Sequence, residues 1–302
     1  MELAFGSLDV DEFVGESAGR DRHAFGELPD YTPKQDTVGW FHAYVGNHAA
    51  VDDVMRERHG PNHLKSAVEH DYYCGRFTRV IERGCAYIAY IDAHRGTGES
   101  KMTNTREMLE IVCRAAMRTK NTDLVRKCAD SLTMQECSEP GIQLTIGKAN
   151  FYVERYDDAI NAYLRYLRMR PQDYSAWKCI GACLAKLAER SAATQPAAAT
   201  TRQCETALAC YVHAMSIAQK SVWTRAAYAH ARYEREMQEM QATIATLKAL
   251  EQDSIARAQI EPVDLPQQPC SDGVLAAVET ELQNGRSSGA AIVEEEKSTR
   301  DL

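Results

Sequence analysis

The stretch GIQLTIGKANFYVERYDDAINAYLRYLRMRPQDYSAWKCIGACLAKL, residues Gly141–Leu187, decides the fold because it repeats one unit at a fixed period. Gly147 recurs as Gly181 after 34 residues, and Ala159 follows Gly147 after 12 residues. The other members of the unit are large side chains and a proline: Tyr163, Tyr166, Pro171 and, opening the next unit, Trp177 and Ile180. This pattern of small and large positions is typical of helical hairpins that stack along a chain.

The small residues predict where the two helices of a unit cross. Gly147 and Gly181 fall where the first helix is crossed closely by its partner, and a Cβ there would push the two backbones apart. Ala159 serves the same purpose on the second helix, with Tyr163 filling the space beside it. The pattern therefore predicts two closely packed helices in each unit.

The ends of these helices are also readable from the sequence. Glu154-Arg155 is the expected turn between the two helices of the first unit, and Tyr156 plugs it. Pro171 ends the second helix, because proline lacks an amide donor and clashes with the preceding turn. Asp173 is placed to cap the helix that follows.

These positions resemble the tetratricopeptide-repeat (TPR) family. The residues that carry the resemblance are Gly147, Ala159, Tyr163, Pro171, Trp177 and Gly181, in two clear repeats at 140–173 and 174–218. A second, less specific resemblance is to an animal family of TPR-like proteins without an established activity. It rests on Trp40-Phe41, Gly75-Arg76-Phe77, Thr122-Asp123-Leu124, Pro171 to Trp177, and the segment from Asp272 to Glu279. The resemblance implies an architecture and no chemistry.

We therefore predict an all-α fold, a TPR-like α-solenoid of about four to five helical hairpins over residues 37–252. Residues 1–36 are expected to be a disordered acidic arm. Val222–Leu250 should form a long C-terminal capping helix. Residues 253–302 should form a linker and an acidic tail that carries a short amphipathic helix at 272–283.

Weaker hairpins are expected before the clear repeats. A helix should begin at Pro61, and Gly75-Arg76-Phe77 parallels the turn Glu154-Arg155-Tyr156. Thr103–Met117 and Leu124–Leu132 should form a further pair. The pair Trp40-Phe41 should fold back on the repeats as a small N-terminal cap.

The second clear repeat carries an insertion. Gly181 and Ala207 are 26 residues apart, which is 14 more than the spacing from Gly147 to Ala159. The insertion falls within 188–203 and includes the alanine-rich stretch Ser191–Thr200, which predicts a longer turn between the helices.

The capping helix changes character along its length. Trp223, Ala227 and Ala231 are expected to pack on the preceding pair. Beyond Met237 the sequence becomes more polar, so this part should project from the stack or cap it.

Composition excludes several functional classes. A net charge of −8 argues against non-specific binding to nucleic acid or an anionic membrane. No basic-then-apolar leader and no apolar run near the roughly 20 residues of a membrane span is present. The ten cysteines form no C-x-x-C pair, which predicts buried, reduced thiols in a cytosolic or nuclear protein and no metal site. No cofactor motif and no catalytic arrangement is found, so we expect a non-enzymatic protein.

The TPR resemblance implies a groove lined by the first helix of each pair, which holds an extended peptide or a helix. The residues expected to bind the partner are Lys148, Phe151, Tyr152, Lys178 and Lys186. Three lysines with aromatic neighbours would suit an acidic or C-terminal peptide, or a helix. Two alternatives stay open: the lysines form a solvated helix face, or the chain's own Val222–Leu250 helix or tail fills the groove.

Two further interpretations concern other partners. Arg165, Arg168 and Arg170 with Tyr163 and Tyr166 form a basic and aromatic stretch that would suit an RNA-binding helical repeat. The net charge and the expected burial of both tyrosines count against that reading. The apolar face of Val274–Leu282 could dock into a partner's groove, although solubilising tails are the commoner case.

Overall fold

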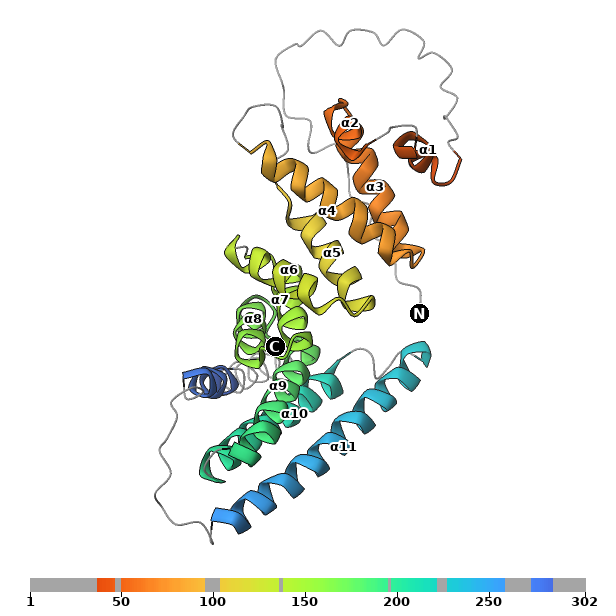
Figure 1. Cartoon of the computed structure of the whole chain (residues 1–302). Helices are drawn as coiled ribbons and strands as arrows, with labels where there is room; N and C mark the ends of the chain where they lie inside the picture. The colour runs from red at the N-terminus through yellow and green to blue at the C-terminus, as the bar shows by residue number, and fades with distance from the viewer. Residues whose placement is uncertain are drawn as a thin grey trace, which may run out of the picture. The chain divides into compact units, whose positions relative to one another are not determined.

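The computed structural model describes residues 37–46, 50–95, 104–135, 138–194, 197–221, 227–258 and 273–284. The chain divides into two units, Met1–Trp40 and Phe41–Leu302, and the description below concerns the second. Its described residues are helical and contain no strand, which confirms the predicted all-α class (Figure 1). The predicted arm at 1–36 and most of the tail lie outside the described residues.

The labelled helices follow one another along the chain (Figure 1). They are α1 (Trp40–Gly46), α2 (Val51–Arg56), α3 (Gly60–Tyr73), α4 (Phe77–Ala93), α5 (Arg106–Arg118), α6 (Thr122–Met134), α7 (Pro140–Tyr152), α8 (Tyr156–Met169), α9 (Tyr174–Thr194), α10 (Ala197–Lys220) and α11 (Ala227–Ala258). A further helix covers residues 273–284.

Within the described residues, α3 to α10 form four helical hairpins, and each hairpin packs on the next. The second helix of one pair contacts the first helix of the following pair at α4–α5, α6–α7 and α8–α9. First helices also contact each other at α3–α5 and α5–α7. This sequential stacking is the predicted helical-repeat architecture, and the number of hairpins lies in the predicted range.

The same turn closes three of the hairpins. Gly75, Lys120 and Glu154 each follow a first helix with a left-handed backbone, at φ values of 72°, 59° and 63°. In each turn the next amide donates back to a carbonyl five residues earlier: Arg76 N to Asp71 O at 2.8 Å, Asn121 N to Ala116 O at 2.9 Å, and Arg155 N to Asn150 O at 2.9 Å. This is the Schellman motif. It confirms the predicted equivalence of Gly75-Arg76-Phe77 with Glu154-Arg155-Tyr156.

The turns also extend the repeat towards the N-terminus. Lys120 precedes Glu154 by 34 residues, the same interval that separates Gly147 from Gly181. Asn121 caps α6 by accepting from the amide of Leu124 at 3.2 Å. The α5–α6 hairpin is therefore a unit of the same kind.

The glycines of the repeat face aromatic rings. A Cβ built on Gly147 would lie 2.6 Å from the ring of Tyr163, and one on Gly181 would lie 2.8 Å from the ring of Tyr211. The prediction of a close approach is confirmed, but the neighbour is a tyrosine side chain rather than the partner backbone. The ring lies against the helix surface that glycine leaves bare, while Ala159 is fully buried on the second helix.

The α8–α9 junction behaves as its sequence predicts. Helix α8 ends at Met169, before Pro171, and the indole Nε1–H of buried Trp177 donates to the Pro171 carbonyl at 3.2 Å. Asp173 Oδ1 accepts from the amide of Ser175 at 2.9 Å. The proline and the aspartate thus set the end of one helix and the start of the next.

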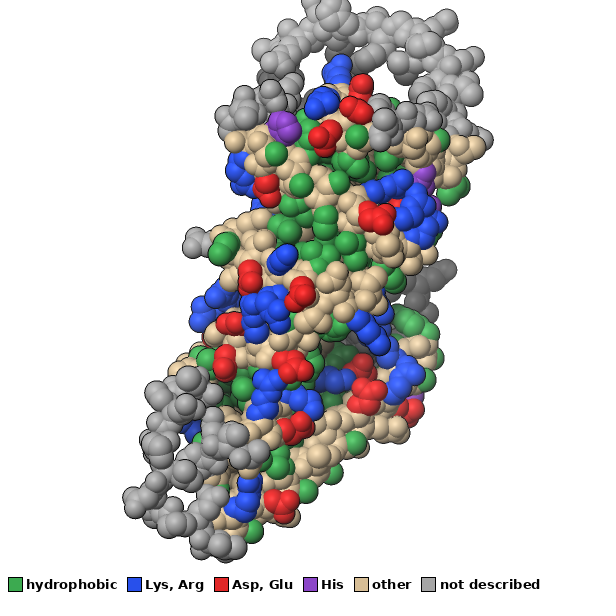
Figure 2. Space-filling view, viewed as in Figure 1, with side chains coloured by type: hydrophobic (Ala, Val, Ile, Leu, Met, Phe, Trp, Pro, Cys, Tyr) green, Lys and Arg blue, Asp and Glu red, His purple; other side chains and the backbone are tan. Residues whose placement is uncertain are grey.

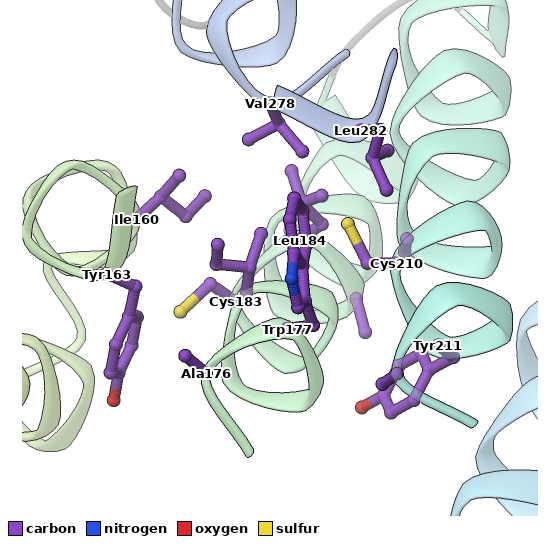
Figure 3. Packing of buried hydrophobic residues seen from close by; sticks show 14 of the residues in the cluster. Ile160, Tyr163, Ala176, Trp177, Cys183, Leu184, Cys210, Tyr211, Val278 and Leu282 are labelled. Atoms are coloured by element: carbon purple, nitrogen blue, oxygen red, sulfur yellow. The ribbon is translucent and has the colours of Figure 1, made fainter. Parts of the chain in front are cut away.

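The core forms two clusters that meet at the α7–α8 hairpin. One cluster runs from Val45 to Ala162, and the other takes most of α8 with α9, α10, α11 and the 273–284 helix. Trp177 and Leu184 of α9 lie in the second cluster, with Ile160 on one side and Cys210 on the other (Figure 3). The clear repeats thus organise this second core.

The predicted N-terminal cap is present from Phe41 onward. The Phe41 ring lies against the His70 ring with centroids 5.5 Å apart, and the Tyr44 ring meets the His63 ring at 4.3 Å. Val45 and Val54 are buried in the first cluster. The segment therefore covers the face of α3.

The predicted long turn in the second repeat is wrong. The extra residues extend both helices, so that α9 reaches Thr194 and α10 begins at Ala197. Alanine has the highest helix propensity, and Ala188 and Ala197 are buried, so the stretch gains more from helical packing than from a solvated loop. The alanine-rich composition thus reflects two longer helices.

The expectation for the start of the capping helix is also wrong. Ala227 and Ala231 are exposed, and Trp223 lies outside the described residues. The later part of α11 is the part that packs: Met237, Met240 and Leu247 are buried, and α11 contacts α10 and α9. Met240 follows Met237 after three positions and Leu247 follows after seven more, spacings that place all three on one helix face. Of the two predicted roles, the polar half therefore caps the stack.

The helix at 273–284 packs on its own chain. Leu275, Val278 and Leu282 are buried in the second cluster, and the last two point towards Trp177, Leu184 and Cys210 (Figure 3). Arg202 of α10 forms a bidentate pair with Glu279, with both N–O distances at 3.1 Å. The predicted amphipathic helix is confirmed, and its apolar face is already occupied by this chain.

Candidate functional site

Helix α7 presents the exposed part of the predicted groove. It buries Ile142, Ile146 and Ala149 in the first cluster. Lys148 is exposed, and Phe151 and Tyr152 are half-buried. We call Lys148, Phe151 and Tyr152 the α7 surface. It combines one cation with two aromatic rings on a first helix.

A polar contact fixes α7 against α5. Thr145 Oγ1 donates to Glu110 Oε1 at 2.9 Å, and Arg114 Nη2 donates to Thr145 Oγ1 at 3.3 Å. Arg114 also pairs with Glu110 at 2.5 Å. Because Thr145 is buried, this small network sets the position of the helix that carries the α7 surface.

Lys178 of α9 is bound by the chain itself. Its Nζ donates to Glu236 Oε2 at 2.6 Å and to Glu239 Oε2 at 3.1 Å, both on α11. Burial alone would lower the pKa of Lys178, but the hydrogen bonds to both glutamates raise it above the ordinary value. At this position the chain's own α11 supplies the carboxylates that bind the lysine.

The three predicted lysines do not form one site. Lys148 lies on α7 and Lys178 on α9, and the charges of both lower the pKa of the Cys179 thiol against the larger effect of burial, which raises it. Lys186 lies two turns further along α9, about 12 Å at the helical rise. It pairs with Glu189 at 2.7 Å, and that hydrogen bond raises its pKa. Of the three, Lys148 is the one that forms no ion pair with a described residue.

The cysteines of the second core are structural. Cys183, Cys204 and Cys210 are buried, and burial raises the pKa of each thiol, to about 11 for Cys204. Thiols in this state stay protonated and react slowly. Among the described residues no group of three or more His, Cys, Asp or Glu side chains could hold a metal ion.

A cavity between α6, α7 and α8 escaped the sequence analysis. It has a volume of about 310 Å³, and its lining includes Asn150, Asp130, Arg155 and Arg165. Arg155 forms two hydrogen bonds to Asp130, at 2.5 and 3.4 Å. The Oδ1 of buried Asn150 has no hydrogen-bond partner among the described residues. The signal in the sequence was a polar residue on the buried face of α7, but asparagine alone does not reveal a cavity.

The residues proposed for RNA binding are dispersed by the fold. Tyr163 and Tyr166 are 1% and 8% exposed, so neither ring is available to stack on a base. The Tyr166 hydroxyl donates to Asp173 at 2.5 Å, and Arg168 pairs with Glu281 at 3.6 Å. In this stretch the two tyrosines are therefore core residues, and Arg168 is part of an ion pair with Glu281 at the surface.

No helix in the described part of the chain has the length and apolar character needed to cross a membrane. Comparison with known proteins found no matching family model, no similar curated protein and no similar solved structure. The α7 surface and the charged clusters are the features of the described residues that point to a function.

Proposed function

We propose that this protein is a non-enzymatic protein–protein interaction adaptor of the TPR type, which binds an acidic peptide or helix of a partner at the α7 surface. The observation that carries the proposal is exposed Lys148, which forms no ion pair with a described residue and lies beside two half-buried rings, Phe151 and Tyr152, on the first helix of a clear repeat. A partner carboxylate meets Lys148, and apolar partner side chains cover the rings.

The apolar contact supplies most of the binding energy in this proposal. An exposed lysine–carboxylate pair contributes about 0–1 kcal/mol. Covering about 100 Å² of ring surface contributes about 2.5 kcal/mol at about 25 cal/mol per Å². The lysine therefore sets specificity for acidic partners and accelerates association, while Phe151 and Tyr152 supply affinity.

The α11 contact supports the proposed chemistry. Lys178 lies on the neighbouring first helix and binds two glutamates that project from one face of a helix, Glu236 and Glu239. An acidic helix is thus a suitable occupant for a lysine on this side of the repeats. We propose that the partner segment continues this arrangement at Lys148, where α11 supplies no carboxylate.

The test is affinity purification with the wild-type chain and Lys148→Glu. Lys127→Glu is the matched control, because Lys127 is also exposed but lies on α6, a second helix. Acidic partners should be lost with Lys148→Glu and retained with Lys127→Glu. Recovery of the same partners at equal yield from all three proteins would refute the proposal.

The RNA-binding alternative has less support, since its two tyrosines are buried. A salt titration of RNA binding separates the two functions, because phosphate contacts weaken as salt concentration rises. We also propose a cytosolic or nuclear location, because the described cysteines are free thiols and such proteins rarely form disulfides.

A further inference from the structure

A buried carboxylate at the end of α3 gathers three arginines. Asp71 has a side-chain exposure of 0%. Its Oδ1 accepts from Arg76 Nε at 2.6 Å, and its Oδ2 accepts from Arg83 Nη1 at 2.9 Å. The Nε of Arg79 lies 3.6 Å from the same Oδ2. On the face shown in Figure 2, basic side chains gather over the turn between α3 and α4.

Two histidines lie in this cluster. Arg83 Nη1 lies 3.2 Å from His42 Nδ1, and Arg76 Nη2 lies 3.4 Å from His42 Nε2 and 3.0 Å from His70 Nδ1. The two imidazoles approach to 2.8 Å between His42 Nε2 and His70 Nδ1. Burial is the main cause that lowers the pKa of His42.

The cluster carries more positive charge than its carboxylate balances. Among the described residues, three guanidinium groups meet one aspartate, which leaves a local charge of about +2 in a chain whose net charge is −8. Burial and the nearby charge of Arg79 lower the pKa of Arg83. The arginines therefore repel one another at short range.

Arg79 is not required to satisfy the hydrogen bonds of the buried Asp71 carboxylate. Arg76 and Arg83 already supply hydrogen bonds to both oxygens of the buried carboxylate. Arg79 is 45% exposed and makes no hydrogen bond to a described residue. Its Nε contributes an ion-pair contact to Asp71 but no hydrogen bond, so its guanidinium adds positive charge to the cluster beyond what the carboxylate needs.

We propose that Arg76, Arg79 and Arg83 form a binding site for a phosphate monoester on a side chain of a partner protein. A phosphorylated side chain carries nearly two negative charges at neutral pH, which matches the charge of the cluster. Guanidinium groups bind phosphate oxygens through paired N–H donors. Asp71 stays in place as the anchor that orients Arg76 and Arg83.

The charge of the arginine cluster favours a phosphate monoester over a carboxylate or a phosphodiester. A carboxylate or a nucleic-acid phosphodiester carries one negative charge and leaves the cluster half-neutralised. A phosphate monoester neutralises it and offers three oxygens to three arginines. The site lies on α3 and α4, apart from the α7 surface, and does not depend on the function proposed there.

The experiment is calorimetric titration of the full chain at fixed ionic strength. The probes are inorganic phosphate, a five-residue glycine peptide with a central phosphoserine, and the same peptide without phosphate. The phosphopeptide should bind, and Arg79→Gln should weaken its binding at least tenfold. Arg126→Gln is the matched control, because Arg126 is 44% exposed and pairs with Asp123 on α6. It should bind like the wild type.

Several results would overturn the proposal. These are equal affinity of wild type and Arg79→Gln, equal affinity for both peptides, binding of inorganic phosphate without the phosphopeptide, or tighter binding of a single-stranded oligonucleotide. A structural role for Arg79 predicts a lower urea midpoint in Arg79→Gln, whereas relief of repulsion predicts an unchanged or higher one. Lys148→Glu should leave phosphopeptide affinity unchanged, which separates this site from the α7 surface.

Discussion

The contact between Gly147 and Tyr163 gives a quantitative test of the repeat. A Cβ at position 147 would lie 2.6 to 2.8 Å from three ring atoms of Tyr163, and this ring is 1% exposed and cannot move into solvent. Overpacking of this kind costs about 1–3 kcal/mol. Replacing a glycine inside a helix by alanine raises the free energy of unfolding by up to about 1 kcal/mol through helix propensity. We therefore expect Gly147→Ala to lower the free energy of unfolding by about 0–3 kcal/mol.

A second glycine of the same helix separates the cost of the clash from the gain in helix propensity. Gly141 of α7 has no neighbouring atom within 4 Å of a built Cβ, so Gly141→Ala reports helix propensity without a clash. Gly147→Ala should therefore be less stable than Gly141→Ala by about 1–3 kcal/mol, the overpacking term alone. The measurement is urea unfolding followed by far-ultraviolet circular dichroism.

A double-mutant cycle assigns the cost to the ring. Tyr163→Leu removes the ring, so the cost of Gly147→Ala should shrink in that background, with a coupling of about 1 kcal/mol. Gly181→Ala should behave like Gly147→Ala, because its Cβ would meet Tyr211 at 2.8 Å. Equal stability of Gly147→Ala and Gly141→Ala would refute the reasoning, since the ring would then not occupy the space that glycine leaves.

Three further predictions concern the ends of the described fold. The pKa of His42 in the folded chain lies below its ordinary value of 6.5. Between these two pKa values the unfolded chain binds more protons, so the free energy of unfolding should fall as the pH drops from 6.5 to the folded pKa. The urea midpoint of His42→Gln should depend less on pH than that of the wild type. The charged and titratable groups around this histidine are His70, Asp71, Arg76, Arg79 and Arg83. Leu282→Ala should cost about 2–5 kcal/mol of packing and speed hydrogen exchange across 273–284. Lys178→Gln should speed exchange in the later half of α11 and leave α3 unchanged.

The sequence by itself determined the repeat, because its signals are local. Gly147, Tyr163 and Pro171 act within one hairpin or at its end, where sterics and a missing amide donor leave few conformations. Asp173 caps the adjacent helix through a side chain two residues from its target. A 34-residue period combines these local constraints, so the hairpins and their order could be predicted without a structure.

Two errors arose where composition was used in place of contacts. The alanine-rich stretch Ser191–Thr200 resembles a flexible loop in composition, yet the same residues favour long helices once a neighbour buries one face. The start of α11 was expected to pack through Ala227 and Ala231, which are exposed, whereas the buried residues Met240 and Leu247 lie in its polar second half. A helix that is polar on average can still bury one face, because apolar residues spaced three or four positions apart lie on the same side of it.

Only the tertiary structure decided which charges are free. Lys148 and Lys178 both lie on first helices of the clear repeats, but α11 brings Glu236 to Lys178 from 58 residues away and leaves Lys148 exposed. Asp71 gathers arginines from α4 and lies beside His42 of α1. Helix geometry is local and was therefore predictable from the sequence. The partners of a charged side chain depend on which distant helices pack beside it, and no period or composition records that.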